Sequence, residues 1–242
     1  MTIKTFIKAL FPKRSLPALR CVYFALFPWK QKPSGKGYHE FGYWETRAKA
    51  EGTLINAHYK PFYTAHFGLT EQDYAGTSIL DIGCGPRGSL EWADMTKERV
   101  GLDPLADYYQ RIGARAHRMR YVSSPCEHIP FPDAHFDTVS SFNSLDHVDN
   151  LEQTADEIVR VLKPGGRFLL LTDVNHQPTP TEPIAFSWDI LSAFLCRGLT
   201  CVQERRYERV PEGLYQGIDK SVPYDHTNQT PRYGILSAHF IK

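Results

Sequence analysis

Cysteine is sparse and unpatterned in this chain, whose five cysteines form no CxxC pair and no regular framework. The sequence therefore suggests neither a zinc site nor a disulfide scaffold. It also has no internal repeat and no low-complexity tract. With 242 residues, ordinary apolar and charged fractions and a net charge of +1, it fits one large α/β domain plus an extension, without a second substrate domain, in a reducing, cytoplasmic setting.

The most informative segment, Ser78–Gly88, reads SILDIGCGPRG: an apolar run ending in an acid breaks directly into three glycines. This pattern predicts a buried strand that turns sharply into a helix beginning at about Ser89. Gly83, Gly85 and Gly88 remove side chains that would keep backbone amides away from a ligand, and the start of a helix presents unpaired N–H groups. The segment therefore predicts a site for a nucleotide-like cofactor.

Two cofactors compete for this turn. Its glycines satisfy the dinucleotide fingerprint GxGxxG, and Asp103 lies at the distance expected of the acid that binds a ribose, which favours NAD. Asp81 argues against NAD, because a carboxylate aimed into the pocket would repel a pyrophosphate. The same carboxylate suits a ligand that carries an ammonium and a sulfonium. S-adenosylmethionine carries both and is the predicted cofactor.

Three further motifs follow in order along the chain: RVGLD (Arg99–Asp103), CEHIPFPDAHFDTV (Cys126–Val139) and VLKPGGRFLLL (Val161–Leu171). With these motifs the chain resembles the class I S-adenosylmethionine-dependent methyltransferases of the type 11-like group, from about Tyr38 to the C-terminus. The resemblance implies a Rossmann-like three-layer α/β sandwich with a mostly parallel seven-stranded sheet and a final antiparallel hairpin. It implies a methyltransferase domain at residues 38–242, after a basic amphipathic helical extension at residues 1–37.

The resemblance also implies roles for single residues. Asp81 would contact the methionine amino group of the cofactor, and Asp103 would bind the ribose hydroxyls. Glu127, beside Cys126, occupies the place of the adenine contact, although a solvated loop position is the alternative for this acid. The implied cofactor set is Asp81, Gly83, Cys84, Gly85, Gly88, Asp103, Cys126, Glu127 and Asn143. Cys84 and Cys126 are expected to pack rather than to act as nucleophiles.

Arg87 departs from the family pattern, in which a small residue is common between Pro86 and Gly88. Its side chain could point to solvent or reach an anionic acceptor.

Alternating strands and helices are expected along the domain. The predicted strands are Ile79–Ile82, Val100–Asp103, Tyr121–Ser123, Thr138–Phe142, Phe168–Val174, Gly198–Arg209 and Tyr233–Ile241. Apolar residues at helical spacing from Leu151 to Leu162 predict one clear helix, which begins with a capping box of Asp149 and Glu152 and ends at Pro164.

Acceptor groups are expected after the fourth and fifth strands and in the insert Pro211–Arg232, because ligands of open α/β sheets bind at the carboxyl ends of the strands. The candidates are Asn143, Asp146, His147, Asp173, Asn175, His176, Tyr215, Tyr224, Asp225 and His226. Phe186 and Trp188 either line the same pocket or pack against the sheet.

His147 and His176 are the predicted catalytic residues, because an alcohol or phenol acceptor needs a base and histidine is matched to neutral pH. Asp146, Asp173 and Asp225 would suit magnesium if they converged, but their spacing does not require it, so no metal is assigned.

These observations predict an enzyme that transfers the methyl group of S-adenosylmethionine to an oxygen, or less favourably a nitrogen, of a small-molecule, glycan or lipid-linked acceptor. One alternative is a nucleic-acid methyltransferase, against which the acidic balance after residue 40 argues. The other is a non-catalytic assembly factor that keeps the cofactor site.

Acidic residues are absent from residues 1–39, which contain eight lysines and arginines. Residues 3–11 place apolar side chains on one helical face, and the apolar run at residues 21–29 is too short to span a bilayer. Pro12 and the basic pair after it argue against a cleaved signal peptide. The segment is either a helical lid packed over the cofactor, as is common in the family, or a peripheral anchor on anionic lipid at the inner face of the membrane; nucleic acid is a third partner.

Overall fold

The computed structural model describes residues 32–56 and 58–242. Residues 1–31, which hold most of the predicted basic extension, lie outside the described residues. The chain divides into two compact units, Met1–Ser34 and Gly35–Lys242, and the second contains all the elements below. Within the described ranges, no helix is long and apolar enough to cross a bilayer.

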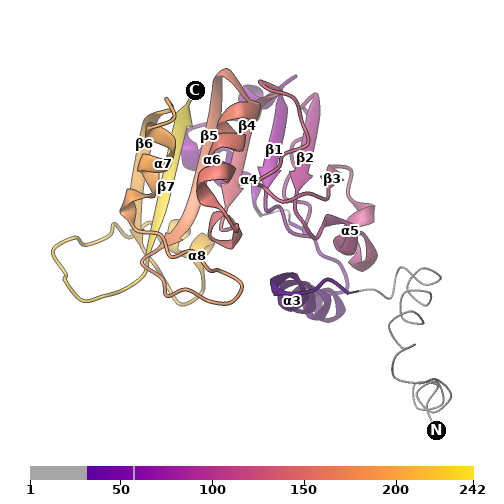
Figure 1. Ribbon diagram of the computed structural model, residues 1–242, viewed down its shortest axis with the longest axis horizontal. Coiled ribbons are helices and arrows are strands. Elements are labelled where there is room, and N and C mark those ends of the chain that lie inside the picture. Colours follow the sequence, from indigo (N-terminus) through magenta and orange to yellow (C-terminus); the bar gives the residue numbers. More distant parts are fainter. Residues whose placement is uncertain (1–31, 57) are drawn as a thin grey trace, which may run out of the picture. The chain divides into compact units, whose positions relative to one another are not determined.

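A seven-stranded sheet with the order β3-β2-β1-β4-β5-β7-β6 forms the centre of the second unit (Figure 1). Its strands are β1 (Ser78–Ile82), β2 (Glu98–Leu102), β3 (Arg120–Val122), β4 (Phe136–Phe142), β5 (Leu162–Val174), β6 (Thr200–Glu208) and β7 (Gly234–Ile241). Strands β1 to β5 pair in parallel, whereas β7 is antiparallel to both β5 and β6. The predicted Rossmann-like sheet with a final antiparallel pair is confirmed.

Helices cover both faces of this sheet. The α-helices are α3 (Lys36–Glu51), α4 (Lys60–Tyr63), α5 (Ala106–Tyr109), α6 (Leu151–Val161), α7 (Ser192–Leu195) and α8 (Leu214–Lys220). The 3-10 turns are η3 (Ala65–Phe67), η4 (Glu71–Tyr74), η5 (Gln110–Ile112), η6 (Ala114–Ala116), η7 (Leu145–His147) and η8 (Trp188–Leu191). Figure 1 shows α6 and α7 over one face of the sheet.

Alternation along the strands divides the core between the two faces. In β5, Phe168 and Leu170 belong to the cluster that packs with α6 and α7, whereas Leu169 and Leu171 belong to the cluster formed with α4 and α8. Successive side chains of a strand point to opposite faces, so a strand that is covered on both sides reads as a continuous apolar run. This is the three-layer sandwich that the resemblance implies.

Helix α6 confirms the predicted helix but not its predicted cap. Asn150, rather than Asp149, is the N-cap residue, and its side chain accepts a hydrogen bond from the amide of Gln153 at 3.2 Å. A Glu127 carboxylate oxygen accepts hydrogen bonds from the amides of Asp149 and Asn150 at 2.6 and 3.0 Å. The proposed capping box is therefore wrong, because Glu127 from a distant loop binds the amides that precede the helix.

The predicted helix at Ser89 is also wrong. Residues 89–97 form successive turns, in which the amides of Glu91 and Ala93 each bond to a carbonyl three residues earlier. Arg99 of β2 donates hydrogen bonds to the carbonyls of Leu90 and Glu91 at 3.3 and 3.1 Å. These two carbonyls are acceptors that a continuous helix would have used. No helix N-terminus therefore faces the glycine turn in the described part of the chain, and the ligand must be bound by side chains and by the turn itself.

Candidate cofactor and acceptor site

A cavity of about 710 Å³ lies at the carboxyl ends of the parallel strands β1, β2 and β4, where open α/β sheets bind ligands. Its lining includes Asp81, Gly83, Cys84, Gly85, Asp103, Cys126, Glu127, Asn143 and His147 from the predicted set. Helix α3 contributes Lys36, His39, Glu40, Tyr43 and Trp44 to the lining. The structure thus brings most of the predicted residues into one cavity that α3 covers.

Two residues of the predicted set do not line this cavity. The amide of Gly88 donates a hydrogen bond to the Tyr121 hydroxyl at 3.0 Å, and a Cβ at Gly88 would lie 2.7 Å from Glu91 Cγ. Gly88 therefore allows close packing of its turn. His176 is buried, and its Nε2 lies 3.6 Å from a carboxylate oxygen of Asp146.

Gly83 brings the turn after β1 against the turn after β4. Its φ is +65°, and a Cβ at this position would lie 2.3 Å from the Cβ of Ser144. Ser144 in turn donates a hydrogen bond to the carbonyl of Ile82 at 2.8 Å. Only glycine satisfies both the left-handed backbone and this close approach.

We expect Gly83→Ala to lower the free energy of unfolding by about 2 to 4 kcal/mol, because it combines left-handed strain with overpacking. Gly76→Ala is the matched control, since Gly76 has a φ of +71° but a Cβ added there would meet no atom within 4 Å. Urea denaturation of both variants measures the difference. Equal losses for the two variants would show that the contact with Ser144 has no cost.

Asp81 is 3% exposed at the end of β1 and faces the cavity. It accepts hydrogen bonds from the hydroxyls of Ser89 and Ser140 at 2.5 and 2.7 Å. Burial raises the pKa of Asp81 to about 6, and the hydroxyl donors oppose this rise. No cationic side chain among residues 32–56 and 58–242 pairs with Asp81, and a buried carboxylate of this kind is suited to a ligand that brings a positive charge.

Asp103 follows β2 and is equally buried. The amides of Leu105 and Gly85 donate hydrogen bonds to its two oxygens at 2.8 and 3.2 Å, which fixes the carboxylate toward the cavity. Burial, with a contribution from the negative charge of Glu40 on α3, raises the pKa of Asp103 to about 7. Two fixed acceptor oxygens at this place match a pair of ribose hydroxyls.

The remaining predicted cofactor residues have distinct surroundings. Burial raises the pKa values of the Cys84 and Cys126 thiols above their ordinary range, so both act as packing residues rather than as thiolate nucleophiles. Asn143 takes a φ of +53°, which turns the chain after β4 and leaves its side chain exposed at the cavity. Glu127 lines the cavity and also accepts hydrogen bonds from the two amides that precede α6. Its side chain is therefore held by the protein and does not lie free in a solvated loop.

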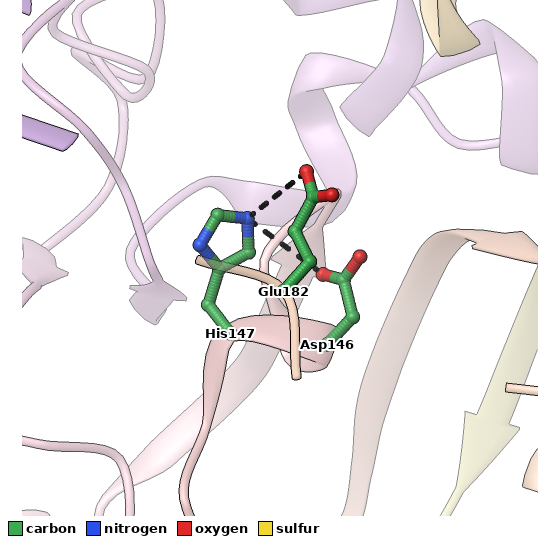
Figure 2. A group of neighbouring side chains, drawn as sticks. All are labelled: Asp146, His147 and Glu182. Carbon is green, nitrogen blue, oxygen red and sulfur yellow. Dashed lines mark ion pairs between the residues drawn. The ribbon is translucent and has the colours of Figure 1, made fainter. Parts of the chain in front are cut away.

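His147 lines the cavity, among carboxylates. Its Nε2 is 3.9 Å from an Asp146 oxygen and 3.8 Å from a Glu182 oxygen (Figure 2). Its Nδ1 is 3.9 Å from a carboxylate oxygen of Glu40. Asp146, Asp173 and Asp225, which were considered from the sequence as a group of acids, do not come together in the structure. Asp173 accepts two hydrogen bonds from Arg209 at 2.8 and 2.9 Å, and Asp225 accepts bonds within its own turn. Neither belongs to the cluster around His147.

Helix α3 is fastened over the cavity at both ends. Arg87 lines the cavity, donates to Glu51 at 2.7 Å and lies over the ring of Trp44, so its side chain is held against α3 rather than extended into solvent. At the other end, Lys36 donates to the carbonyl of His147 at 2.6 Å and pairs with Asp149. Sequence reasoning missed this helix as a part of the site, although its aromatic content was a usable signal.

An aromatic wall also escaped the sequence analysis. Tyr59 and Tyr63 line the cavity together with Tyr215 from α8, whose ring centroid lies 4.6 Å from that of Tyr59. Tyr215 confirms that the long insert reaches the pocket. Phe186 and Trp188 instead pack against the sheet, and Trp188 contributes with Tyr224 to a separate cavity of about 330 Å³.

Comparisons with known proteins agree with this geometry. Residues 80–170 match a family model described as a methyltransferase domain. The C-methyltransferase UbiE of ubiquinone and menaquinone biosynthesis from Pseudomonas fluorescens is 35% identical over 112 residues, which are 40% of this chain and 42% of that protein. The O-methyltransferase cnsE of Penicillium expansum is 26% identical over 61% of this chain and 55% of that protein. The chain thus spans about half the length of these relatives.

Solved structures show the same fold. The [4+2]-cyclase SpnF aligns with a TM-score of 0.64 at 17% identity, covering 87% of this chain and 97% of that one. The sheet order and the covering helices define a Rossmann-like domain. Over residues 80–170 the chain is similar to the methyltransferase domain, and it shares its fold with solved S-adenosylmethionine-dependent methyltransferases.

Proposed function

We propose that this chain transfers the methyl group of S-adenosylmethionine to an oxygen of a small-molecule, glycan or lipid-linked acceptor. The observation that carries the proposal is the position of His147, which lies in the cofactor cavity with its Nε2 between two carboxylates. An acceptor that arrives as a hydroxyl must lose a proton before or during methyl transfer, and an imidazole in such surroundings is suited to take it.

The rest of the cavity supports alignment of the donor. Asp81 pairs with the ammonium of the methionyl group, and Asp103 accepts hydrogen bonds from the ribose hydroxyls. Gly83 and Gly85 let the cofactor approach the backbone, and Glu127 lies at the adenine end. Methyl transfer is an in-line displacement at carbon: the bond from carbon to sulfur breaks as the bond from carbon to the acceptor oxygen forms. Alignment of the reactants therefore supplies much of the rate acceleration.

A carbon acceptor is the second candidate, because UbiE is named as a C-methyltransferase whereas cnsE is named as an O-methyltransferase. A ring carbon made nucleophilic by a neighbouring phenolate needs the same removal of a proton, so the His147 cluster serves both reactions. Analysis of the methylated product by NMR distinguishes a new methoxy group from a new carbon-bound methyl group.

A screen of hydroxylated acceptors with tritiated S-adenosylmethionine tests the proposal. Calorimetry with S-adenosylhomocysteine, NAD and NADP accompanies it, and only S-adenosylhomocysteine is expected to bind tightly. Tight cofactor binding without transfer to any small acceptor would favour the assembly-factor alternative. Transfer to RNA or DNA alone would replace the proposal by the nucleic-acid alternative.

For residues 1–37 we propose peripheral binding to anionic lipid, which would bring a lipid-linked acceptor to the site. Each basic residue near such a surface contributes about 1 kcal/mol. We expect the full chain to sediment with vesicles of anionic lipid, in a manner that weakens with salt, and a variant beginning near Gly37 to remain in solution. Equal partitioning of both proteins, or failure of the shorter one to fold, would instead support a packed lid.

A further inference from the structure

A compact group of ligating atoms lies at the acceptor end of the cavity. Asp146 and His147 come from the turn η7 after β4, and Glu182 comes from the loop between β5 and η8 (Figure 2). One ligating atom from each residue lies within 4.8 Å of the other two. The imidazole of His147 points its Nε2 between the carboxylates of Asp146 and Glu182, as Figure 2 shows.

Two buried polar atoms beside this group lack hydrogen bonds. Asp146 is 3% exposed, and its Oδ1 has no hydrogen-bond partner among residues 32–56 and 58–242. The same holds, within those ranges, for Nε2 of His176, which lies 3.6 Å from the other oxygen of Asp146. Leaving a buried carboxylate oxygen without a partner is unfavourable, because the atom has lost its water without gaining a donor or a cation.

The spacing of the group fits a metal ion. Asp146 Oδ1 and Glu182 Oε1 lie 3.9 and 3.8 Å from His147 Nε2. A point equidistant from three atoms so spaced lies about 2.2 to 2.5 Å from each of them, which is the range of metal–ligand distances. The cluster therefore needs little movement to hold a cation, and the cation would neutralise two neighbouring carboxylates.

We propose that Asp146, His147 and Glu182 bind one divalent cation of the first transition series at the acceptor end of the cavity. One imidazole and two carboxylates form a mixed nitrogen and oxygen set, which suits manganese, iron, cobalt or zinc better than the all-oxygen sites of magnesium and calcium.

Neighbouring groups hold the ligands in place. Thr179 donates a hydrogen bond to the second carboxylate oxygen of Glu182 at 3.2 Å, which leaves Oε1 for the ion. Glu40 faces Nδ1 of His147 at 3.9 Å, the arrangement in which a carboxylate orients a metal-binding imidazole. His176 supplies a further nitrogen beside Asp146.

The ion has a defined part in the reaction, and this step rests on the proposed function. His147 and Glu182 line the cavity, so open coordination positions face the acceptor. A hydroxyl bound there loses its proton to solvent, because the cation lowers the pKa of the bound oxygen. The resulting oxyanion attacks the methyl carbon, and neutral S-adenosylhomocysteine leaves. With the ion bound, the imidazole acts as a ligand, and the charge of the ion replaces the role of base that the proposed function gives to His147; methyl transfer to the acceptor oxygen is unchanged.

Calorimetry of the chelator-treated full-length protein with manganese tests the proposal, together with electron paramagnetic resonance of the bound ion. We expect one manganese ion per chain. Glu182→Gln and His147→Ala should each weaken binding by more than ~10-fold, because each removes one ligand. Asp225→Asn and His226→Ala are the matched controls, since both residues are exposed and lie outside the cluster. Cobalt titration, followed by visible absorption, reports directly on the ligand set.

Absence of stoichiometric manganese and cobalt binding would overturn the proposal, and so would binding that both ligand variants retain. Full turnover of the metal-free enzyme, with loss of turnover in His147→Ala, would also overturn it and leave His147 as a base. Circular dichroism and S-adenosylhomocysteine binding check that each variant is folded. If the protein binds the cofactor but no metal, the metal proposal fails and the proposed methyl transfer still stands. If the protein binds the metal but transfers no methyl group, only the proposed methyl transfer fails.

Discussion

We expect His147→Ala to lower the turnover of methyl transfer by about 100-fold or more, while the affinity for S-adenosylhomocysteine stays within a few fold. His147 is proposed to activate the acceptor, whereas the carboxylates of Asp81 and Asp103 in the same cavity are proposed to hold the donor. Its removal therefore affects activation of the acceptor and leaves binding of the cofactor. Steady-state kinetics with a saturating cofactor, together with calorimetry, separates the two effects.

His226→Ala is the control for this experiment, because His226 is exposed and belongs to the separate smaller cavity. Its turnover should equal that of the unmodified enzyme. Undiminished turnover in His147→Ala would mean that alignment of the reactants suffices and that the acceptor needs no activation. His176→Ala then becomes informative, since this buried residue reaches the site only through Asp146.

The second large effect is expected at Asp103. Replacement by asparagine should weaken binding of S-adenosylhomocysteine by about 1.5 to 3 kcal/mol, or roughly 10- to 150-fold, because charge-assisted hydrogen bonds to the ribose hydroxyls are lost. Asparagine keeps a carbonyl oxygen for the amide of Leu105, so the turn after β2 should persist. Asp107→Asn, at an exposed position four residues later, is the matched control. Unchanged affinity in Asp103→Asn would remove this residue from the cofactor site.

The pH dependence of binding provides an independent readout of the same residue. The proposed cofactor contacts require the ionised carboxylates, whereas the pKa values of Asp103 and Asp81 in the free protein are raised to about 7 and about 6. Affinity should therefore be highest above pH 7 and should fall as the pH drops through 7 and then 6, because protonated acids must first lose their protons. Asp103→Asn should lose the step near pH 7 and keep the one near pH 6.

The sequence could predict that the residues proposed to hold the donor lie together, because each of them follows a single strand. The acid at the end of β1, the glycine turn and the acid after β2 are adjacent in the sequence to the runs that form the strands. Parallel pairing of β1 with β2 then places Asp81 and Asp103 at one sheet edge. Local pattern and sheet geometry therefore point to the same place.

The rest of the site depends on contacts that no local pattern contains. Glu182 reaches the cluster from a loop without secondary structure. Tyr215 lies on helix α8, which forms within the insert Pro211–Arg232 and was not predicted. The expected helix at Ser89 failed for a similar reason, because Arg99 of the next strand binds carbonyls that the helix would have used. The local glycine pattern predicted that helix, but long-range hydrogen bonds determine the local structure.

The two ion pairs that hold the ends of α3 affect how the proposed cofactor is exchanged. Helix α3 lines the cavity and is held by Arg87 to Glu51 at one end and by Lys36 to Asp149 at the other, so we expect exchange of the proposed cofactor to require release of one of these pairs. Both pairs lie near the surface, so dissolved salt screens them. Residence time of the spent cofactor should consequently shorten as ionic strength rises, which makes the departure of product, rather than the methyl transfer itself, the step that responds to the ionic surroundings.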